Sequence, residues 1–217
     1  MDMTKTLERA GVIPVIVIED AAQAAPLARA LVEGGLPVLE VTFRTAAAAA
    51  AIRAIRAEVP EAVVGAGTLL TPAMVAAAKD AGAAFGVAPG FDPAVVAAAR
   101  ERGLEMVPGV ATASELSQAL TAGLKLVKFF PAEAAGGVKM IKNLLGAFRF
   151  TGVRFMPTGG VNLSNVRDYL AVPEIVCCGG TWIVPKDALA RGDWAAIARL
   201  AAEAAAAVRA ARGNMVE

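Results

Sequence analysis

The chain has 217 residues, of which 57% are hydrophobic and 19% are charged, and its formal net charge is +1. This composition supplies a large apolar core and excludes a disordered chain. The near-neutral charge argues against nucleic acid or an anionic membrane surface as the main partner.

The first ten residues, MDMTKTLERA, are polar and helical in character, which predicts a short N-terminal helix and not a signal peptide. No apolar run in the chain approaches the roughly 20 residues of a membrane span. We therefore expect a cytoplasmic protein without a membrane partner.

Short apolar runs alternate with alanine-rich helical runs through the rest of the chain. The apolar runs are continuous, which is typical of parallel strands that are buried on both faces. The expected strands cover residues 13–18, 36–43, 62–68, 83–90, 104–110, 124–131, 153–160 and 174–182. The expected helices begin after them, at residues 21, 45, 71, 92, 113, 138, 163 and 193.

Residues at the helix boundaries support this division. Thr45 is expected to cap the N-terminus of the second of these helices, and Thr71 and Asp92 each precede a proline at the first helical position. Glycines commonly end helices. Those that stand just before an expected strand are Gly34, Gly35, Gly82, Gly103 and Gly123.

Eight strand–helix units predict one (β/α)₈ barrel, a TIM barrel, that spans residues 1–217 as a single domain after the short N-terminal helix. An open doubly wound sheet is the alternative. No G-x-G-x-x-G motif opens a helix in the context that such a sheet needs, and GAGT at 65–68 resembles that motif only superficially.

The chain contains no histidine, and its two cysteines, Cys177 and Cys178, are adjacent. The absence of histidine excludes a Ser-His-Asp triad, a Cys-His pair and a His-ligated metal site. Adjacent cysteines on a strand point to opposite faces, so we expect no disulfide between them, which suits a reducing compartment. Carboxylate, lysine, tyrosine or water must transfer any proton.

Two opposite charges stand in apolar strands, Glu40 in LEVTF and Lys128 in LVKFFPAE. Burying a charge is costly unless it is paired. The two side chains can meet across the barrel, and a buried acid–base pair at the catalytic end of a barrel indicates function. A purely structural ion pair is the alternative. Lys125 lies three residues before Lys128, faces the opposite side of the strand and is expected at the lower rim.

A desolvated lysine can be neutral, and its amine then attacks carbonyl carbon to form a Schiff base. The Schiff base is an electron sink for making or breaking the adjacent carbon–carbon bond, and a nearby carboxylate can carry the protons. This is the arrangement of a class I aldolase, with Lys128 and Glu40 as the catalytic residues. It needs neither a metal nor another cofactor.

Two glycine pairs lie at the ends of the last two expected strands, where barrels commonly bind phosphate through loop amides. Two ordinary tight turns are the alternative. The candidate residues of this anion site are Thr158, Gly159, Gly160, Gly179, Gly180 and Thr181.

Arg44 stands just past the second expected strand, where its planar fork can bind a substrate carboxylate, with the hydroxyl of Thr68 as a further donor. A surface salt bridge of Arg44 is the alternative. Phe130 ends the strand of Lys128 and can form a wall of the pocket.

The motifs LEVTFRT, GAGT, APG, KFFPAEAAGG, PTGG and CGGTW, in this order and spacing, resemble the bacterial 2-keto-3-deoxy-6-phosphogluconate (KDPG) and 4-hydroxy-2-oxoglutarate (KHG) aldolase family. The resemblance runs from about Gly11 to the final helix. It implies a reversible cleavage of KDPG to pyruvate and glyceraldehyde 3-phosphate, and of 4-hydroxy-2-oxoglutarate to pyruvate and glyoxylate.

The resemblance also implies a role for each matching residue. Lys128 matches the Schiff-base lysine, and Glu40 matches the acid/base that works through a bound water. The remaining matches are Arg44 and Thr68 at the pyruvate carboxylate, Pro89 and Phe130 at the pocket walls, and Thr158, Gly159, Gly160, Gly179, Gly180 and Thr181 toward the phosphate. The family often has serine where Thr181 stands. Its members are usually homotrimers and need no metal.

Two alternatives to this function stay open. One is another phosphate-binding barrel enzyme, such as an isomerase or a protein of the thiamine-phosphate synthase type, which does not need a buried lysine on the sixth strand. The other is a non-catalytic or engineered oligomeric scaffold built on the same barrel. The joint presence of Glu40, Arg44 and Lys128 argues against a loss of activity.

Overall fold

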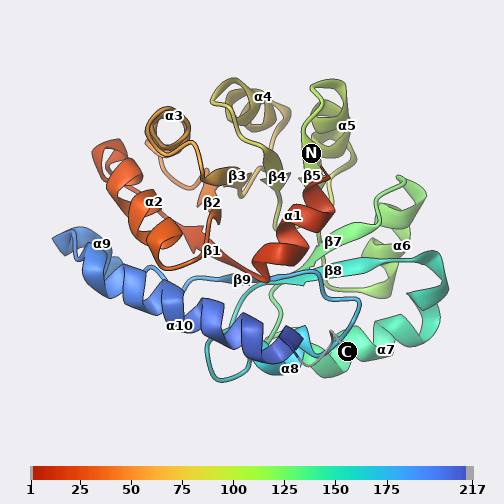
Figure 1. The fold of residues 1–217 in the computed structure, drawn as a ribbon. Helices are drawn as coiled ribbons and strands as arrows, with labels where there is room; N and C mark the ends of the chain where they lie inside the picture. Colours follow the sequence, from red (N-terminus) through yellow and green to blue (C-terminus); the bar gives the residue numbers. More distant parts are fainter. Residues whose placement is uncertain (1, 214–217) are drawn as a thin grey trace.

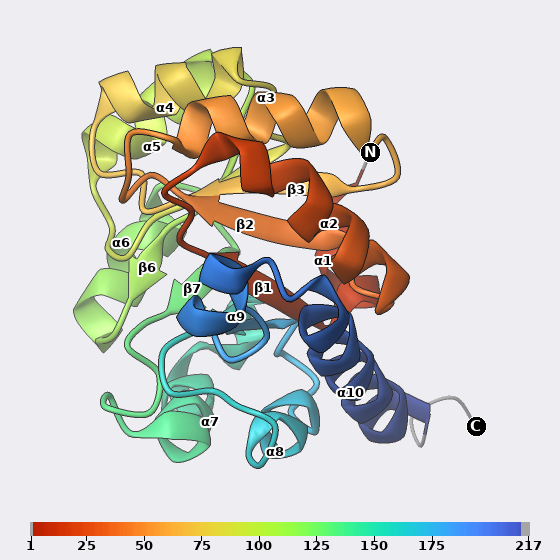
Figure 2. The same cartoon turned by 90° about the vertical axis from the view of Figure 1, so that its left-hand side faces the viewer.

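The computed structural model describes residues 2–213 and has an α/β fold in which helices surround parallel strands (Figures 1 and 2). The strands are β1 (Val12–Ile16), β2 (Val38–Thr42), β3 (Val63–Gly67), β4 (Phe85–Val87), β5 (Glu105–Val107), β6 (Gly109–Val110), β7 (Leu126–Phe129), β8 (Arg154–Pro157) and β9 (Cys178–Gly180). The helices are α1 (Met3–Ala10), α2 (Ala24–Glu33), α3 (Ala48–Glu58), α4 (Pro72–Asp80), α5 (Pro93–Glu101), α6 (Ala113–Thr121), α7 (Gly137–Phe148), α8 (Val166–Leu170), α9 (Lys186–Arg191) and α10 (Trp194–Arg212), with short 3₁₀ turns at Ala21–Gln23 and Arg149–Thr151.

All strand pairs are parallel, as the sequence predicts. The strands form a six-stranded sheet in the order β5-β4-β3-β2-β1-β9 and a three-stranded sheet in the order β6-β7-β8. The strand that was expected at 104–110 is divided into β5 and β6 at Pro108, because proline has no N–H to donate to a ladder. The sheet arrangement therefore differs from the single eight-stranded array that was expected.

The helices pack apolar side chains onto the outer faces of the strands, and a second, smaller cluster lies inside. Met3 and Leu7 of α1 belong to the inner cluster, together with Ile13 and Val38 near the beginnings of β1 and β2. The predicted N-terminal helix α1 therefore covers the end of the sheet where the strands begin, which faces the viewer in Figure 1.

The adjacent cysteines separate as expected. Cys177 belongs to the inner cluster and Cys178 to the outer one, and both are free and buried. Burial raises the pKa of both thiols well above its usual value, so neither is a nucleophile near neutral pH.

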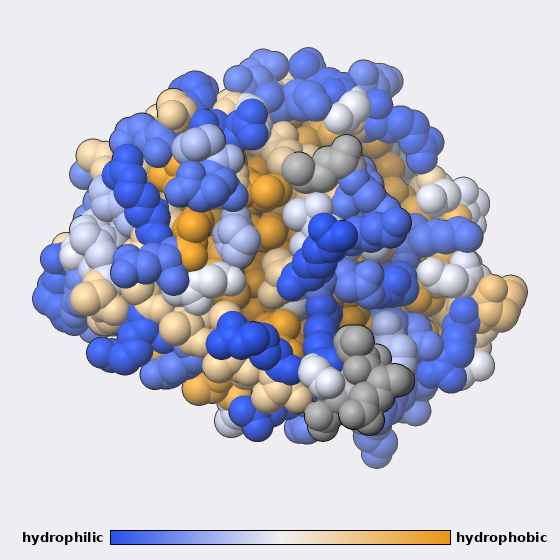
Figure 3. Space-filling model, viewed as in Figure 1, coloured by the Kyte–Doolittle hydropathy of each residue, from blue (hydrophilic) through white to orange (hydrophobic). Residues whose placement is uncertain are grey.

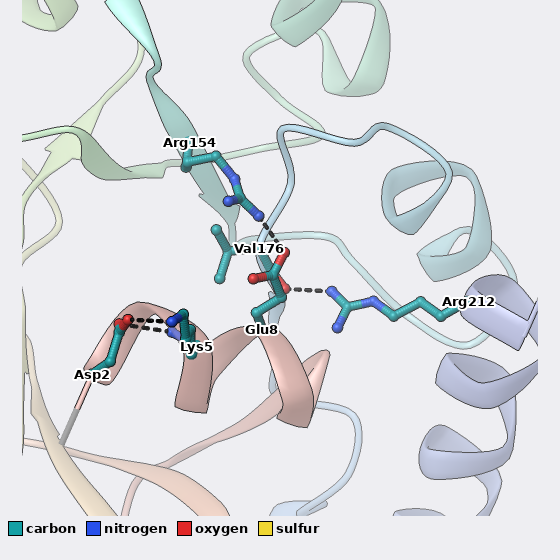
Figure 4. A network of polar contacts seen from close by, with 6 residues as sticks. All are labelled: Asp2, Lys5, Glu8, Arg154, Val176 and Arg212. Carbon is teal, nitrogen blue, oxygen red and sulfur yellow. Dashed lines mark hydrogen bonds and ion pairs between the residues drawn. The ribbon is translucent and has the colours of Figure 1, made fainter. Parts of the chain in front are cut away.

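Polar contacts fasten two helices to the end of the fold that α1 covers (Figure 4). Glu8 of α1 forms an ion pair with Arg154 of β8, and Arg212 of α10 donates a hydrogen bond to the carbonyl of Val176. The surface over this end is mainly hydrophilic, with apolar side chains showing between the polar ones near its centre (Figure 3). The contacts of Glu8 and Arg212 thus hold α1 and α10 against this end of the strands.

The observed helix caps confirm two of the three that were expected. Thr71 accepts a hydrogen bond from the amide of Met74, and Asp92 caps α5 in the same way. The expected cap at Thr45 is wrong. Its hydroxyl instead donates to the carbonyl of Ile18 at 2.5 Å, and α3 begins at Ala48 without a side-chain cap. The Thr45 hydroxyl therefore bonds to a residue distant in sequence, and not to the helix that the local pattern predicted it would cap.

A capping box at α6 gives a test of the local stability of the fold. The Thr112 hydroxyl accepts from the Glu115 amide at 3.3 Å, and the Glu115 carboxylate accepts from the Thr112 amide at 2.9 Å. Thr112→Ala removes this cap and should lower the free energy of unfolding by about 1 kcal/mol, measured by urea unfolding. Ser117→Ala on the same helix is the control. An equal loss in that control would show that the cap is not the cause.

The hydrogen bond from the Ala111 amide, and those from Thr112, lower the pKa of Glu115 in the folded chain. Because the pKa of Glu115 is lower in the folded chain than in the unfolded chain, where it is about 4.3, the ionised carboxylate stabilises the fold at pH values above the unfolded pKa. This stabilisation is lost as the pH falls through the folded pKa. The cost of Thr112→Ala should therefore shrink in acid.

Candidate active site

The two buried charges, Lys128 on β7 and Glu40 on β2, lie together in the structure. Lys128 is 5% exposed and Glu40 is 1% exposed, and the Lys128 Nζ atom lies 3.8 Å from the Glu40 Oε1 atom. Their strands are not neighbours, because β7 pairs with β6 and β8, and β2 pairs with β1 and β3. The side chains therefore meet across the interior, as the sequence analysis expected.

Glu40 has acceptor capacity that Lys128 does not use. The Oε2 atom of Glu40 is buried and has no hydrogen-bond partner among residues 2–213. A buried carboxylate oxygen without a donor is unfavourable by about 1–3 kcal/mol or more. The arrangement is suited to receive a hydroxyl group or a water molecule at Oε2 while Oε1 faces the amine.

Glycine on the neighbouring strand makes room for the carboxylate. A Cβ atom at Gly67 of β3 would lie 2.0 Å from the Glu40 Oε1 atom. Two residues earlier, a Cβ atom at Gly65 would lie 2.3 Å from the ring of Phe85. The GAGT segment thus has a packing function. Its glycines admit a carboxylate and an aromatic ring into the interior, and nothing about it requires a dinucleotide.

An aromatic ring flanks the amine. The Lys128 Nζ atom lies 5.1 Å from the ring centroid of Phe130. Residues two apart on a strand share a face, so both side chains point inward from β7 and its end. A ring face at this distance attracts an ammonium group and also provides an apolar wall. Lys125, three residues before Lys128, is exposed, which agrees with its expected place at the rim.

The threonine and glycine residues proposed from the sequence for an anion differ in exposure. Thr158 is buried, and its Oγ1 atom has no hydrogen-bond partner among the described residues. Thr158 forms a parallel bridge with Gly179, where a Cβ atom would lie 2.3 Å from the Thr158 hydroxyl oxygen. Gly180 is buried beside the ring of Trp182, whereas Gly160 and Thr181 are exposed. Thr158, Gly179 and Gly180 are therefore buried, Gly159 is half-buried, and Gly160 and Thr181 lie at the surface.

Arg44 and Thr181 line one cavity of about 290 Å³. Lys186 lines the same cavity, which places a second cation beside a hydroxyl and a guanidinium. The sequence analysis did not single out Lys186. Its position directly after the CGGTWIVP segment was the only signal that could have found it.

Thr68 and Pro89 occupy the ends of β3 and β4 at the same side of the molecule. Thr68 has a φ of 59°, a left-handed conformation that is uncommon for a residue other than glycine and costs on the order of 1 kcal/mol. The Pro89 carbonyl lies against Gly109, where a Cβ atom would approach the oxygen to 2.1 Å. No hydrogen bond or ion pair of residues 2–213 joins Thr68 or Pro89 to the Lys128–Glu40 pair.

Within residues 2–213 no group of three or more Cys, Asp and Glu side chains has the arrangement of a metal site. Across the same residues, no helix has both the length and the apolar character that a bilayer crossing needs.

Known proteins resemble this chain over nearly its whole length. A family model described as KDPG and KHG aldolase matches residues 3–200. The KHG/KDPG aldolase of Escherichia coli (strain K12) is 50% identical over 193 residues, which cover 89% of this chain and 90% of the relative.

Solved structures agree. The 2-keto-3-deoxy-6-phosphogluconate aldolase of Zymomonas mobilis ZM4 with 3-phosphoglycerate superposes with a TM-score of 0.87 at 46% identity, covering 94% of this chain and 95% of that one. The KDPG aldolase of Legionella pneumophila, with pyruvate captured at low pH as a covalent carbinolamine intermediate, superposes with a TM-score of 0.87 at 42% identity, covering 92% and 96%.

The contact between Gly67 and Glu40 can be tested by adding one methyl group. Gly67→Ala forces the carboxylate away from its position, and overpacking of this kind should lower the free energy of unfolding by about 1–3 kcal/mol. Gly90→Ala is the matched control, because a Cβ atom there meets nothing within 4 Å. Denaturant unfolding of both variants measures the difference. Equal stabilities would mean that Gly67 is not needed for the carboxylate.

Proposed function

The chain belongs to the KDPG and KHG aldolase family, and from this premise we propose that it cleaves KDPG to pyruvate and glyceraldehyde 3-phosphate through a Schiff base on Lys128. The chain is a class I aldolase and therefore a lyase. The observation that carries the assignment of Lys128 is the buried pair that it forms with Glu40, at 3.8 Å between Nζ and Oε1, with the ring of Phe130 5.1 Å from the amine.

Lys128 supplies the nucleophile. Glu40 takes a proton from the Lys128 ammonium group, and the neutral amine attacks the C2 ketone of the substrate to give a carbinolamine. Glu40 then gives this proton to the carbinolamine hydroxyl, which leaves as water, and an iminium ion remains. The covalent carbinolamine of pyruvate in the Legionella pneumophila enzyme supports this step. The iminium ion accepts the electron pair of the C3–C4 bond when that bond breaks.

Glu40 carries the protons. It removes the C4 hydroxyl proton, directly or through a water molecule, as the C3–C4 bond breaks and glyceraldehyde 3-phosphate leaves. The remaining enamine takes a proton at C3, and water hydrolyses the imine to release pyruvate and the free Lys128 amine. The unpartnered Oε2 atom supports this role, because it can accept a hydroxyl proton while Oε1 stays near the amine.

The two ends of the substrate need two anion sites. For the carboxylate of the keto acid we propose Arg44 and Thr68, with Pro89 and Phe130 as pocket walls. The phosphate group belongs with Thr158, Gly159, Gly160, Gly179, Gly180 and Thr181. Because Thr181 lines the same cavity as Arg44, the two anion sites adjoin each other. The 3-phosphoglycerate in the Zymomonas mobilis structure supports a phosphate-bearing ligand in this family. The same site accepts 4-hydroxy-2-oxoglutarate, with glyoxylate as the second product.

We also propose that the strands close into the (β/α)₈ barrel that the sequence predicts, as one domain. β5 and β6 are separated only by Pro108, so one strand takes part in both sheets. Isolated parallel bridges between Phe155 and Ile175, and between Thr158 and Gly179, run between β8 and the β9 segment. These contacts support a closed cylinder with the Lys128–Glu40 pair inside.

From the same resemblance we propose a cytoplasmic homotrimer that works without a metal or another cofactor. The Schiff base on Lys128 provides the electron sink that a metal would otherwise provide. Sedimentation of the purified chain measures the number of subunits, and turnover after treatment with a chelator measures any need for a metal.

Replacing Lys128 tests the covalent step. Borohydride with pyruvate should attach pyruvate to the unchanged chain at Lys128 and not to Lys128→Arg, because an arginine side chain forms no Schiff base. Cleavage of KDPG should fall by at least about 10³-fold, the scale of loss when a covalent nucleophile is removed. Lys125→Arg, an exposed lysine on the same segment, is the matched control. Retained cleavage in Lys128→Arg would contradict the mechanism.

Replacing Glu40 separates proton transfer from covalent capture. Glu40→Gln keeps the shape of the side chain but removes the base, so steady-state cleavage should fall by about 10²–10⁴-fold. Borohydride trapping of pyruvate should still label Lys128, with a slower rate. Glu58→Gln, a carboxylate that pairs with Arg29 on the surface, is the control. Full cleavage activity in Glu40→Gln would assign the proton to another group.

A further inference from the structure

Two residues outside the proposed mechanism form a contact beside the proposed phosphate loop. Tyr169 is the only tyrosine of the chain and is fully buried on α8. Its hydroxyl donates a hydrogen bond to the Oε1 atom of Glu133. Glu133 ends the KFFPAE motif that begins with Lys128, so this contact joins the catalytic strand segment to α8.

The backbone of the same segment holds the turn that follows β8. The amide of Ala132 donates to the carbonyl of Thr158 at 2.8 Å, and the amide of Glu133 donates to the carbonyl of Gly159 at 3.0 Å. Gly159 and Gly160 both have left-handed φ values, 99° and 83°. The Gly159–Gly160 turn is therefore attached directly to the loop that follows the catalytic lysine.

The side chain of Glu133 packs on this turn with its stem and not with its charge. A Cβ atom at Gly160 would lie 2.6 Å from both the Cβ and the Cγ atoms of Glu133. The carboxylate end lies elsewhere, because a Cβ atom at Gly137 would meet Glu133 Oε1 at 3.1 Å and the Tyr169 hydroxyl at 3.4 Å. The tyrosine thus fixes where the negative charge is held.

The turn is held from its other side by the segment that leads into α8. The side-chain amides of Asn162 and Asn165 each donate to the carbonyl of Gly160 at 3.1 Å. Asn165 immediately precedes α8, and Tyr169 lies on that helix. The hydroxyl of Tyr169 therefore connects the two supports of the turn, the loop after β7 and the start of α8.

The carboxylate of Glu133 has space to move if the hydroxyl is removed. A cavity of about 410 Å³ lies beside it, lined in part by Asp168 and Tyr169. Burial, and then the hydrogen bond to Glu133, raise the pKa of Tyr169 above its usual value, so the hydroxyl keeps its proton and remains a donor at all physiological pH values.

We propose that the Tyr169–Glu133 hydrogen bond is a positioning contact that holds the Gly159–Gly160 turn in place for the substrate phosphate, and so sets the preference for phosphorylated substrates. This inference rests on the proposed function. Two effects follow from the contact. It preorganises the amides of the turn, and it keeps the Glu133 carboxylate at Gly137, so that its charge does not approach the phosphate dianion.

The test compares KDPG with the same keto acid without its phosphate, 2-keto-3-deoxygluconate. Tyr169→Phe should raise KM for KDPG by about tenfold, the size of one lost hydrogen bond, while kcat stays within about twofold. Glu133→Ala loses the same contact but also removes the charge that would repel the phosphate, so it should raise KM for KDPG by less than Tyr169→Phe does. KM for the unphosphorylated substrate and the borohydride trapping of pyruvate should not change. Glu133→Gln keeps an oxygen that accepts the hydrogen bond from Tyr169, so this variant should retain the phosphate preference of the unchanged chain.

Glu8→Ala is the matched control, because it breaks a carboxylate contact at the opposite end of the strands. The inference is overturned if Tyr169→Phe raises KM equally for the two substrates, or if Tyr169→Phe and Glu133→Ala both leave the phosphate preference unchanged. Neither outcome would contradict the proposed aldolase reaction. If Tyr169→Phe does not fold, Glu133→Ala gives the same comparison at an exposed side chain.

The unchanged chain separates the remaining outcomes. If it forms no adduct with pyruvate, the proposed function fails. If it forms the adduct but does not prefer the phosphorylated substrate, the phosphate site is wrong and the positioning role of Tyr169 and Glu133 is overturned with it.

Discussion

The site depends on one ion pair between strands that are not neighbours, Lys128 with Glu40. Taking two charges out of water is costly, and either charge left alone would be far more costly than the pair. The interior must therefore hold them at one depth and keep apolar groups around them. The ring of Phe130 lies beside the Lys128 amine as an apolar wall. The glycines of β3 leave space for the Glu40 carboxylate and the Phe85 ring. A change that moves either charge affects both the fold and the chemistry.

The two ends of the strands differ in their role: packing contacts gather at the beginnings of the strands, and the proposed site lies at their carboxyl ends. At the beginning of the strands, α1 places Met3 and Leu7 into the interior, and the contacts of Glu8 and Arg212 fasten two helices to β8 and the segment before β9. At the other end, β2 finishes in threonine, β3 and β9 in glycine, and β8 in proline. Backbone there can approach a ligand closely, because few side chains intervene. Stability at one end permits open loops at the other, which is the usual division in folds with parallel strands.

Local signals in the sequence predict the structure correctly, except where a contact between distant parts of the chain overrides them. Asp92 followed by Pro93 predicted the start of α5 correctly, because capping involves only residues a few positions apart. The same reasoning failed at Thr45, whose hydroxyl is used by Ile18 from another part of the chain. The run LEMVPGV at 104–110 predicted one strand, and Pro108 divides it. Lys186 was missed because its proximity to Arg44 exists only in the folded chain.

The sequence by itself determined the kinds of elements, their order and their parallel direction, because hydrophobic runs, caps and glycines act over short distances. It also determined the chemical types in the site, since Glu40 and Lys128 are conspicuous as charges in apolar strands. Only the tertiary structure decided which atoms meet. The 3.8 Å separation of Nζ and Oε1 and the unpartnered Oε2 atom depend on how two strands distant in sequence are placed relative to each other, and the contact between Tyr169 and Glu133 depends on how α8 packs against the loop after β7. These placements result from packing of the whole core, which no short segment specifies.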